Sequence, residues 1–165
     1  MCTGHRPAGA KRQVIGVFSR DWQLKMAEVL SLLGTSHAMI VHSEGLDEIR
    51  LDAATHVVEL RDGTISEFEL SPTDFGIDLQ SSDAVSLLAA DSTESSLTLV
   101  EQALGDPDSL AADIVSLNAG AAIYVAGVAT NLANGITMAQ DVIAAGLARE
   151  RFDELVRVTK MMGEE

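Results

Sequence analysis

The dipeptide Asp62-Gly63 constrains the fold of this chain most, because it separates two runs that both favour β-strands. Thr55–Arg61 precedes it and Thr64–Leu70 follows it, and both runs are rich in β-branched and apolar residues. A two-residue hairpin turn of type I′ needs positive φ at both central positions, which Asp-Gly tolerates well. The sequence therefore predicts two antiparallel strands joined at this dipeptide. The acidic side chains of these strands are expected to face solvent: Glu59, Glu67 and Glu69.

The residues before the hairpin predict a strand, a helix and a second strand. Residues 13–18 form a short apolar run, and Ser19 after it is a suitable N-cap for a helix over residues 20–33, which Gly34 would end. His37–His42 is a second apolar run. Five apolar residues recur at helical spacing between the strands: Trp22, Met26, Val29, Leu30 and Leu33. Trp22 and Met26 on this stripe are expected to pack in the core.

The second half of the chain is helical in pattern. Ser92 or Thr93 can cap a helix to about residue 104, Ser109 one that runs toward residue 128, and Asn131 a last helix or helix pair to about residue 160. The glycines of this region are expected to allow close helix packing and not to bind phosphate: Gly120, Gly127 and Gly135. The whole order predicts an α/β fold, a mixed β-sheet flanked by helices.

Composition limits the classes of function. The chain has 165 residues, enough for one domain, and a formal net charge of −14, which opposes binding to nucleic acid or to an anionic membrane. A run of about 18 apolar residues, which a membrane span needs, is absent from the sequence. The single cysteine, Cys2, cannot form an internal disulfide, and residues 1–12 lack the apolar stretch of a secretory signal, so we expect none. We therefore expect a cytoplasmic protein with neither nucleic acid nor membrane as partner.

An acidic turn follows the predicted strand His37–His42. Asp47 and Glu48 are adjacent carboxylates just beyond a strand end, where such a pair can meet a magnesium ion that in turn holds substrate phosphates. Judged by spacing alone, the pair fits two solvated turn residues better than a metal site. His42, at the strand end, fits a hydrogen-bonded structural histidine better than a general base. Asn118, inside a predicted helix, could anchor a neighbouring loop, although the sequence does not show which one.

Four blocks of sequence resemble anthranilate phosphoribosyltransferase of tryptophan biosynthesis. They are QVIGVFS at residues 13–19, HSEGLDE at residues 42–48, SPTDFG at residues 71–76 and NAGAA at residues 118–122. The resemblance runs from about Pro7 to the end and covers only the C-terminal half of such enzymes. It implies part of the catalytic domain of the nucleoside phosphorylase/phosphoribosyltransferase fold. On this basis we divide the chain into an irregular, non-matching start (1–12) and the C-terminal part of the phosphoribosyltransferase α/β domain (13–165).

The resemblance also implies an activity. Similar enzymes transfer phosphoribosyl from phosphoribosyl pyrophosphate to anthranilate with the help of Mg²⁺, and the residues that match their magnesium ligands are Asp47 and Glu48. Three expected parts are absent from these residues: a Gly-Thr-Gly-Gly-Asp loop, a Lys-His-Gly-Asn-Arg segment and the arginine that helps hold anthranilate. The alternative is therefore a truncated, catalytically inactive fragment. A homodimer or a complementing N-terminal half is the expected protein partner.

Overall fold

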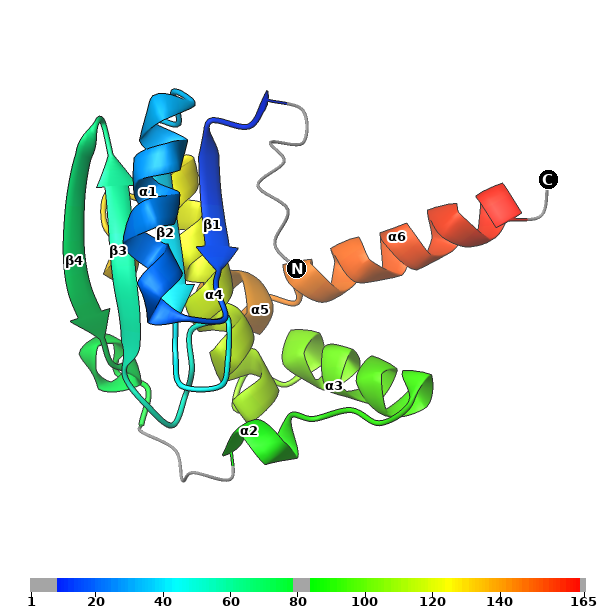
Figure 1. The fold of residues 1–165 in the computed structure, drawn as a ribbon. Helices are drawn as coiled ribbons and strands as arrows, with labels where there is room; N and C mark the ends of the chain where they lie inside the picture. Colours follow the sequence, from blue (N-terminus) through cyan, green and yellow to red (C-terminus); the bar gives the residue numbers. More distant parts are fainter. Residues whose placement is uncertain (1–8, 79–83, 164–165) are drawn as a thin grey trace.

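A four-stranded sheet forms the centre of the computed structural model, which describes residues 9–78 and 84–163 (Figure 1). The strands lie in the order of the sequence: β1 (Arg12–Gly16), β2 (His37–His42), β3 (Thr55–Arg61) and β4 (Thr64–Leu70). β1 pairs with β2 in parallel, whereas β2 with β3 and β3 with β4 are antiparallel. The predicted mixed sheet is therefore confirmed.

Helices and helical turns connect and cover the strands. Between β1 and β2 lie the 3₁₀ turn η2 (Arg20–Trp22) and α1 (Gln23–Leu32). The segments after β4 are η3 (Pro72–Phe75), α2 (Ala84–Leu87), α3 (Thr93–Gly105), α4 (Leu110–Ala126), α5 (Leu132–Ala144) and α6 (Leu147–Gly163). Figure 1 shows α1 on one face of the sheet, α4 on the other, and α6 extending away from both.

The predicted hairpin is confirmed, with the turn type that its sequence indicates. Asp62 has φ 49° and Gly63 has φ 83°, both in the left-handed region that a type I′ turn requires. The strands pair from Arg61 opposite Thr64 to Thr55 opposite Leu70. Asp62 is the one residue other than glycine with positive φ in the described part of the chain, as the tolerance of aspartate for this region allows.

The sheet separates two apolar cores, because side chains along a strand alternate between its faces. Met39, Val41 and Val57 face α4, and they pack with residues of α4 and α5 such as Leu117 and Ile136. The intervening strand residues pack against α1 on the opposite face: Ala38, Ile40, Val58 and Leu60. Both faces of β2 are therefore buried, which explains its uninterrupted apolar sequence.

α1 buries a stripe that overlaps only in part with the one that its sequence suggests. Ser19 is the predicted cap and accepts a hydrogen bond from the amide of Asp21 at 3.4 Å. The helix then buries Gln23, Ala27 and Leu30, whereas Trp22 is 48% exposed. The expectation that Trp22 packs in the core is wrong, because the helix lies on the sheet along the neighbouring stripe. Val29 and Leu33 of the same stripe are also exposed, whereas Leu30 is buried and Met26 packs against the core as expected.

The helices of the second half begin at the predicted caps. Ser92, Ser109 and Asn131 each accept a hydrogen bond from the backbone amide three residues later. The last predicted element is a pair, α5 and α6, separated at Gly146, which has φ 74°. In the described part of the chain no individual helix has the length and apolar content to cross a membrane; α3 and α4 meet that test only when taken together across their 73° bend.

Two of the three glycines named above bring α4 and α5 together. A side chain on Gly120 would overlap Ile136, and one on Gly135 would overlap the Gly120 carbonyl, so the helix backbones touch at this crossing. Gly127 has a different role: with φ 79° it forms the C-cap of α4. Close packing is therefore confirmed for Gly120 and Gly135, whereas Gly127 ends its helix.

Candidate functional site

The acidic turn begins where β2 ends, at the carboxyl edge of the parallel pair β1 and β2. The amide of Ser43 donates to the Leu46 carbonyl at 3.0 Å, and the amide of Leu46 donates back to the Ser43 carbonyl at 2.8 Å. Gly45 supplies the positive φ of 80° that this tight turn needs. The reversal places Asp47 and Glu48 directly after the closed turn, and both side chains are exposed.

Gly16, the last residue of β1, lies directly against Asp47. A side chain at this position would overlap the Asp47 carbonyl and approach its Cβ atom. Only glycine lets the end of β1 and the acidic turn come this close. The contact fixes the backbone of Asp47 relative to the sheet.

Asn118 of α4 holds the chain just after the two carboxylates. Its Oδ1 accepts from the amide of Ile49 at 3.0 Å, and its Nδ2 donates to the Ile49 carbonyl at 3.0 Å and to the Ile114 carbonyl at 3.0 Å. Ile49 is 2% exposed and Leu51 is 1% exposed, so the segment enters the core at this point. Asn118 therefore anchors a loop, as its sequence context suggested, and the loop is the one that carries Asp47 and Glu48.

Arg50 is committed to other partners. Its Nε and Nη2 donate to the two carboxylate oxygens of Asp52 at 2.7 and 2.6 Å, and its Nη1 contacts the Glu44 carbonyl. This bidentate contact lowers the pKa of Asp52 and raises the pKa of Arg50. Within residues 9–78 and 84–163, no base forms an ion pair with Asp47 or Glu48.

His42 is hydrogen-bonded to the backbone. Its Nδ1 donates to the Val17 carbonyl at 2.7 Å, which ties the end of β2 to the segment after β1. This contact agrees with a structural histidine, and His42 also lines a cavity of about 450 Å³. The cavity lies between the acidic turn and the start of β3, where Arg20 and His56 also line it.

His56 belongs to a small buried network with α1. Gln23 donates through Nε2 to the carbonyls of Ile40 and His56 at 2.7 and 2.8 Å, and its Oε1 accepts from His56 Nδ1 at 2.7 Å. Burial lowers the pKa of His56, and the positive charge of Arg20 acts in the same direction. A neutral His56 thus joins α1 to the sheet beside the cavity.

The two carboxylates of the acidic turn fit magnesium better than a metal that needs a complete protein cage. No group of three or more His, Cys, Asp or Glu side chains that could hold a metal ion occurs among the described residues. Magnesium is commonly bound by one or two carboxylates together with water and substrate phosphates. Asp47 and Glu48 are exposed, and no basic residue in the described part of the chain forms an ion pair with them, so they can serve in this way.

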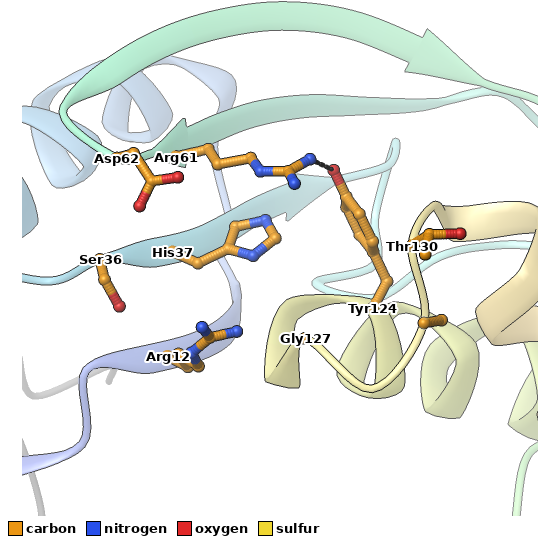
Figure 2. Close-up of a pocket in the computed structure, with 9 residues that line it drawn as sticks. Arg12, Ser36, His37, Arg61, Asp62, Tyr124, Gly127 and Thr130 are labelled. Atoms are coloured by element: carbon orange, nitrogen blue, oxygen red, sulfur yellow. Dashed lines mark hydrogen bonds between the residues drawn. The ribbon is translucent and has the colours of Figure 1, made fainter.

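The expectation that Glu59 is solvated is wrong. Its Oε1 accepts from Tyr124 Oη at 2.8 Å and from His37 Nε2 at 2.7 Å, and its side chain is 12% exposed. The alternation of β3 turns Glu59 toward α4, on the same face as Val57. The sequence carried one indication of this. Glu59 lies two positions after the apolar Val57, so its side chain is expected on the same face of the strand as that of Val57. A polar network therefore lies at the other end of the sheet, where Arg61 and Tyr124 line a second cavity (Figure 2).

Comparison with known proteins supports the resemblance seen in the sequence. The profile of the glycosyl transferase family, a/b domain, matches residues 5–149. An anthranilate phosphoribosyltransferase from Marinomonas sp. (strain MWYL1) is 52% identical over 157 residues, which are 93% of this chain and 44% of the relative. One from Stutzerimonas stutzeri (strain A1501) is 48% identical over 164 residues, which are 96% of this chain and 46% of the relative. The chain thus spans about half the length of the curated relatives that it matches.

Solved structures agree with this assignment. The crystal structure of anthranilate phosphoribosyltransferase from Thermus thermophilus has a TM-score of 0.75 and 33% identity, over 92% of this chain and 45% of that one. The enzyme from Saccharomyces cerevisiae in complex with PRPP and Mg has a TM-score of 0.70 at 23% identity, over 84% of this chain and 40% of that one, and this shows the fold alone. The predicted phosphoribosyltransferase/nucleoside phosphorylase-like fold is confirmed. The chain belongs to the glycosyl transferase family, a/b domain, and it resembles anthranilate phosphoribosyltransferases over about half of their length.

Proposed function

We propose that this chain supplies the magnesium-binding side of an anthranilate phosphoribosyltransferase active site, with Asp47 and Glu48 as the metal ligands. The observation that carries the proposal is the acidic turn itself, held by Gly16 and Asn118 with both carboxylates exposed. The relatives that match this chain over more than nine-tenths of its length are named for this activity. The proposed reaction transfers phosphoribosyl from phosphoribosyl pyrophosphate to anthranilate, a step of tryptophan biosynthesis.

The chemistry assigns a limited role to these residues. The amine of anthranilate forms a bond to the anomeric carbon while the bond to the pyrophosphate oxygen breaks, through a transition state with oxocarbenium character. A bound magnesium ion would neutralise the departing pyrophosphate. Asp47 and Glu48 supply hard oxygen ligands for that ion. Asn118 holds the loop at Ile49, so that the carboxylates need not be ordered when the donor binds.

We also propose that these 165 residues do not catalyse the transfer by themselves. The Gly-Thr-Gly-Gly-Asp loop that would cradle the pyrophosphate is absent from them, and so is the arginine expected to pair with the anthranilate carboxylate. Positioning of two reactants contributes effective molarities of roughly 10⁵ M or more. A chain that orients neither reactant should therefore show no measurable turnover.

The partner that we propose is a complementing N-terminal half. Among the described residues, β1 has β2 as its single neighbour in the sheet, so one edge of the parallel pair is open to another strand. α6 buries none of its side chains and extends away from the sheet (Figure 1). The outer face of α1 exposes Val29 at 50% and Leu32 at 89%. These apolar surfaces favour coverage by further protein over exposure to water.

The metal site can be tested by an NMR titration of the chain with Mg²⁺. We expect the backbone amides of residues 47–49 to shift in the natural chain and not in an Asp47→Asn, Glu48→Gln double variant. α6 offers a matched control, because Asp153→Asn with Glu154→Gln removes the same two charges from another adjacent pair. Equal magnesium shifts in both double variants would contradict the assignment.

The catalytic proposal is tested by mixing purified chain, Mg²⁺, phosphoribosyl pyrophosphate and anthranilate, and following anthranilate fluorescence. We expect a constant signal with the chain alone and a loss of signal after a separate N-terminal half is added. Loss of signal with the chain alone, abolished by the Asp47→Asn, Glu48→Gln double variant, would show that these residues are active and would overturn the proposal of inactivity.

A further inference from the structure

Three basic side chains form a row across the sheet at the end opposite the acidic turn. Arg12 of β1 lies beside His37 of β2, and His37 lies opposite Arg61 of β3. All three share the face that Met39 and Val57 turn toward α4. Because neighbouring strands lie about 4.8 Å apart, this register brings two arginines to either side of one histidine. In a chain with 11 Lys and Arg against 25 Asp and Glu, this is a local concentration of positive charge.

Both guanidinium groups are held in place by α4 or by the segment after it. Arg12 Nη1 donates to the Val125 carbonyl at 3.0 Å, and a side chain on Gly127 would overlap this guanidinium. Arg61 Nη1 donates to Tyr124 Oη at 3.0 Å (Figure 2). Within the part of the chain that the structure describes, these are the single hydrogen bonds of each guanidinium. Their remaining N–H groups are ordered donors, and ordering in advance lowers the entropy cost of binding.

The nearest carboxylates leave the two guanidinium groups of the row available. Glu59 is occupied through one oxygen by Tyr124 and His37 and does not line the cavity. Asp62 does line it, and Figure 2 shows its carboxylate on the side of Ser36, whereas the Arg61 guanidinium points toward Tyr124. Two fixed positive charges therefore face one negative charge at the rim.

The cavity in front of this row has a volume of about 350 Å³ and a polar lining that includes the hydroxyl groups of Ser36, Tyr124 and Thr130. Guanidinium groups match the oxygens of carboxylate and phosphate geometrically, and hydroxyl groups can complete the shell of such an anion. We propose that this cavity is a second binding site, distinct from the acidic turn, for a small ligand carrying a carboxylate or phosphate group. The two sites lie at opposite ends of the strands, so this assignment does not depend on the proposed activity.

The test is an NMR titration of the full chain, without magnesium, with inorganic phosphate in one series and acetate in another. Sodium chloride keeps the ionic strength equal, because exposed charges are screened by salt. We expect saturable shifts of the amides of Ser36, Asp62 and Gly127. Arg12→Gln and Arg61→Gln should each weaken binding at least about tenfold, the loss expected for a hydrogen bond to a charged group. Arg157→Gln, on the exposed face of α6, removes an equal charge elsewhere and should leave the affinity unchanged.

The two series distinguish the sources of the anion: saturation by phosphate alone assigns a phosphate site, by acetate alone a carboxylate site, and by both a general oxyanion site. If Arg61→Gln does not fold, Arg61→Lys keeps the charge and loses the planar fork, and weaker binding is again expected. The proposal is overturned if neither anion saturates. Equal affinities in the arginine variants and in Arg157→Gln would overturn it as well.

Discussion

Replacing Asn118 with alanine tests whether one side chain of α4 holds the acidic turn in place. The substitution removes the two hydrogen bonds that Asn118 makes with the backbone of Ile49, both 3.0 Å long. Ile49 is 2% exposed, so its amide and carbonyl lose their partner where water has little access. An unsatisfied buried polar group costs about 1–3 kcal/mol, and two of them cost about 2–6 kcal/mol. Alanine returns about 0.5 kcal/mol through its helix propensity, so we expect a loss of about 1.5 kcal/mol or more.

The assay is urea unfolding followed by far-ultraviolet circular dichroism, with the free energy of unfolding extrapolated to water. Circular dichroism suits this chain better than tryptophan fluorescence, because Trp22 is 48% exposed in the folded state. Asn134→Ala is a matched control: its side chain donates to Thr130 Oγ1 at 3.0 Å on the surface of α5. We expect the control to change stability by about 0.5 kcal/mol or less.

The same variant should also weaken magnesium binding, by about tenfold, because a residue that orients metal ligands affects affinity without touching the metal. Titration with Mg²⁺ below the unfolding temperature would separate this effect from the loss of stability. A free energy of unfolding equal to that of Asn134→Ala would refute the reasoning, since it would mean that other contacts hold Ile49. Unchanged magnesium affinity in a destabilised Asn118→Ala chain would limit Asn118 to a role in stability.

Three further predictions concern the hairpin, the buried ion pair and the helix crossing. Gly63→Val should cost on the order of 1 kcal/mol or more, because a β-branched residue tolerates positive φ poorly, and an unchanged melting temperature would contradict the type I′ turn. The pKa of Asp52 is lowered in the folded chain, because Arg50 stabilises its charged form. The contact therefore stabilises the fold fully above pH 3.8, the ordinary pKa of the group. This stabilisation is lost as the pH falls through the lower pKa of the folded state. Urea midpoints at several pH values should therefore converge for the natural chain and Asp52→Asn below that range; a constant difference would oppose the assignment. Gly135→Ala should cost about 1–3 kcal/mol in urea unfolding, because its methyl group would overlap the Gly120 carbonyl, and full stability would show that the helices can separate without cost.

The sequence by itself determined the features that depend on neighbouring residues. The hairpin followed from Asp62-Gly63, since few residues tolerate positive φ at two successive positions. The helix starts followed from Ser109 and Asn131, because a capping side chain reaches an amide only three residues away. The resemblance to a family likewise rested on contiguous blocks of sequence, and it directed attention to the acidic turn.

Only the tertiary structure decided which distant residues meet. Asn118 and Ile49 are 69 positions apart, and their contact depends on how α4 lies across the sheet. The basic row of Arg12, His37 and Arg61 depends on strand register, which a shift of one residue would destroy. Glu59 and Trp22 were misjudged for the same reason. Polarity and periodicity give the chance that a side chain is buried, whereas the partner element decides which stripe or face is covered.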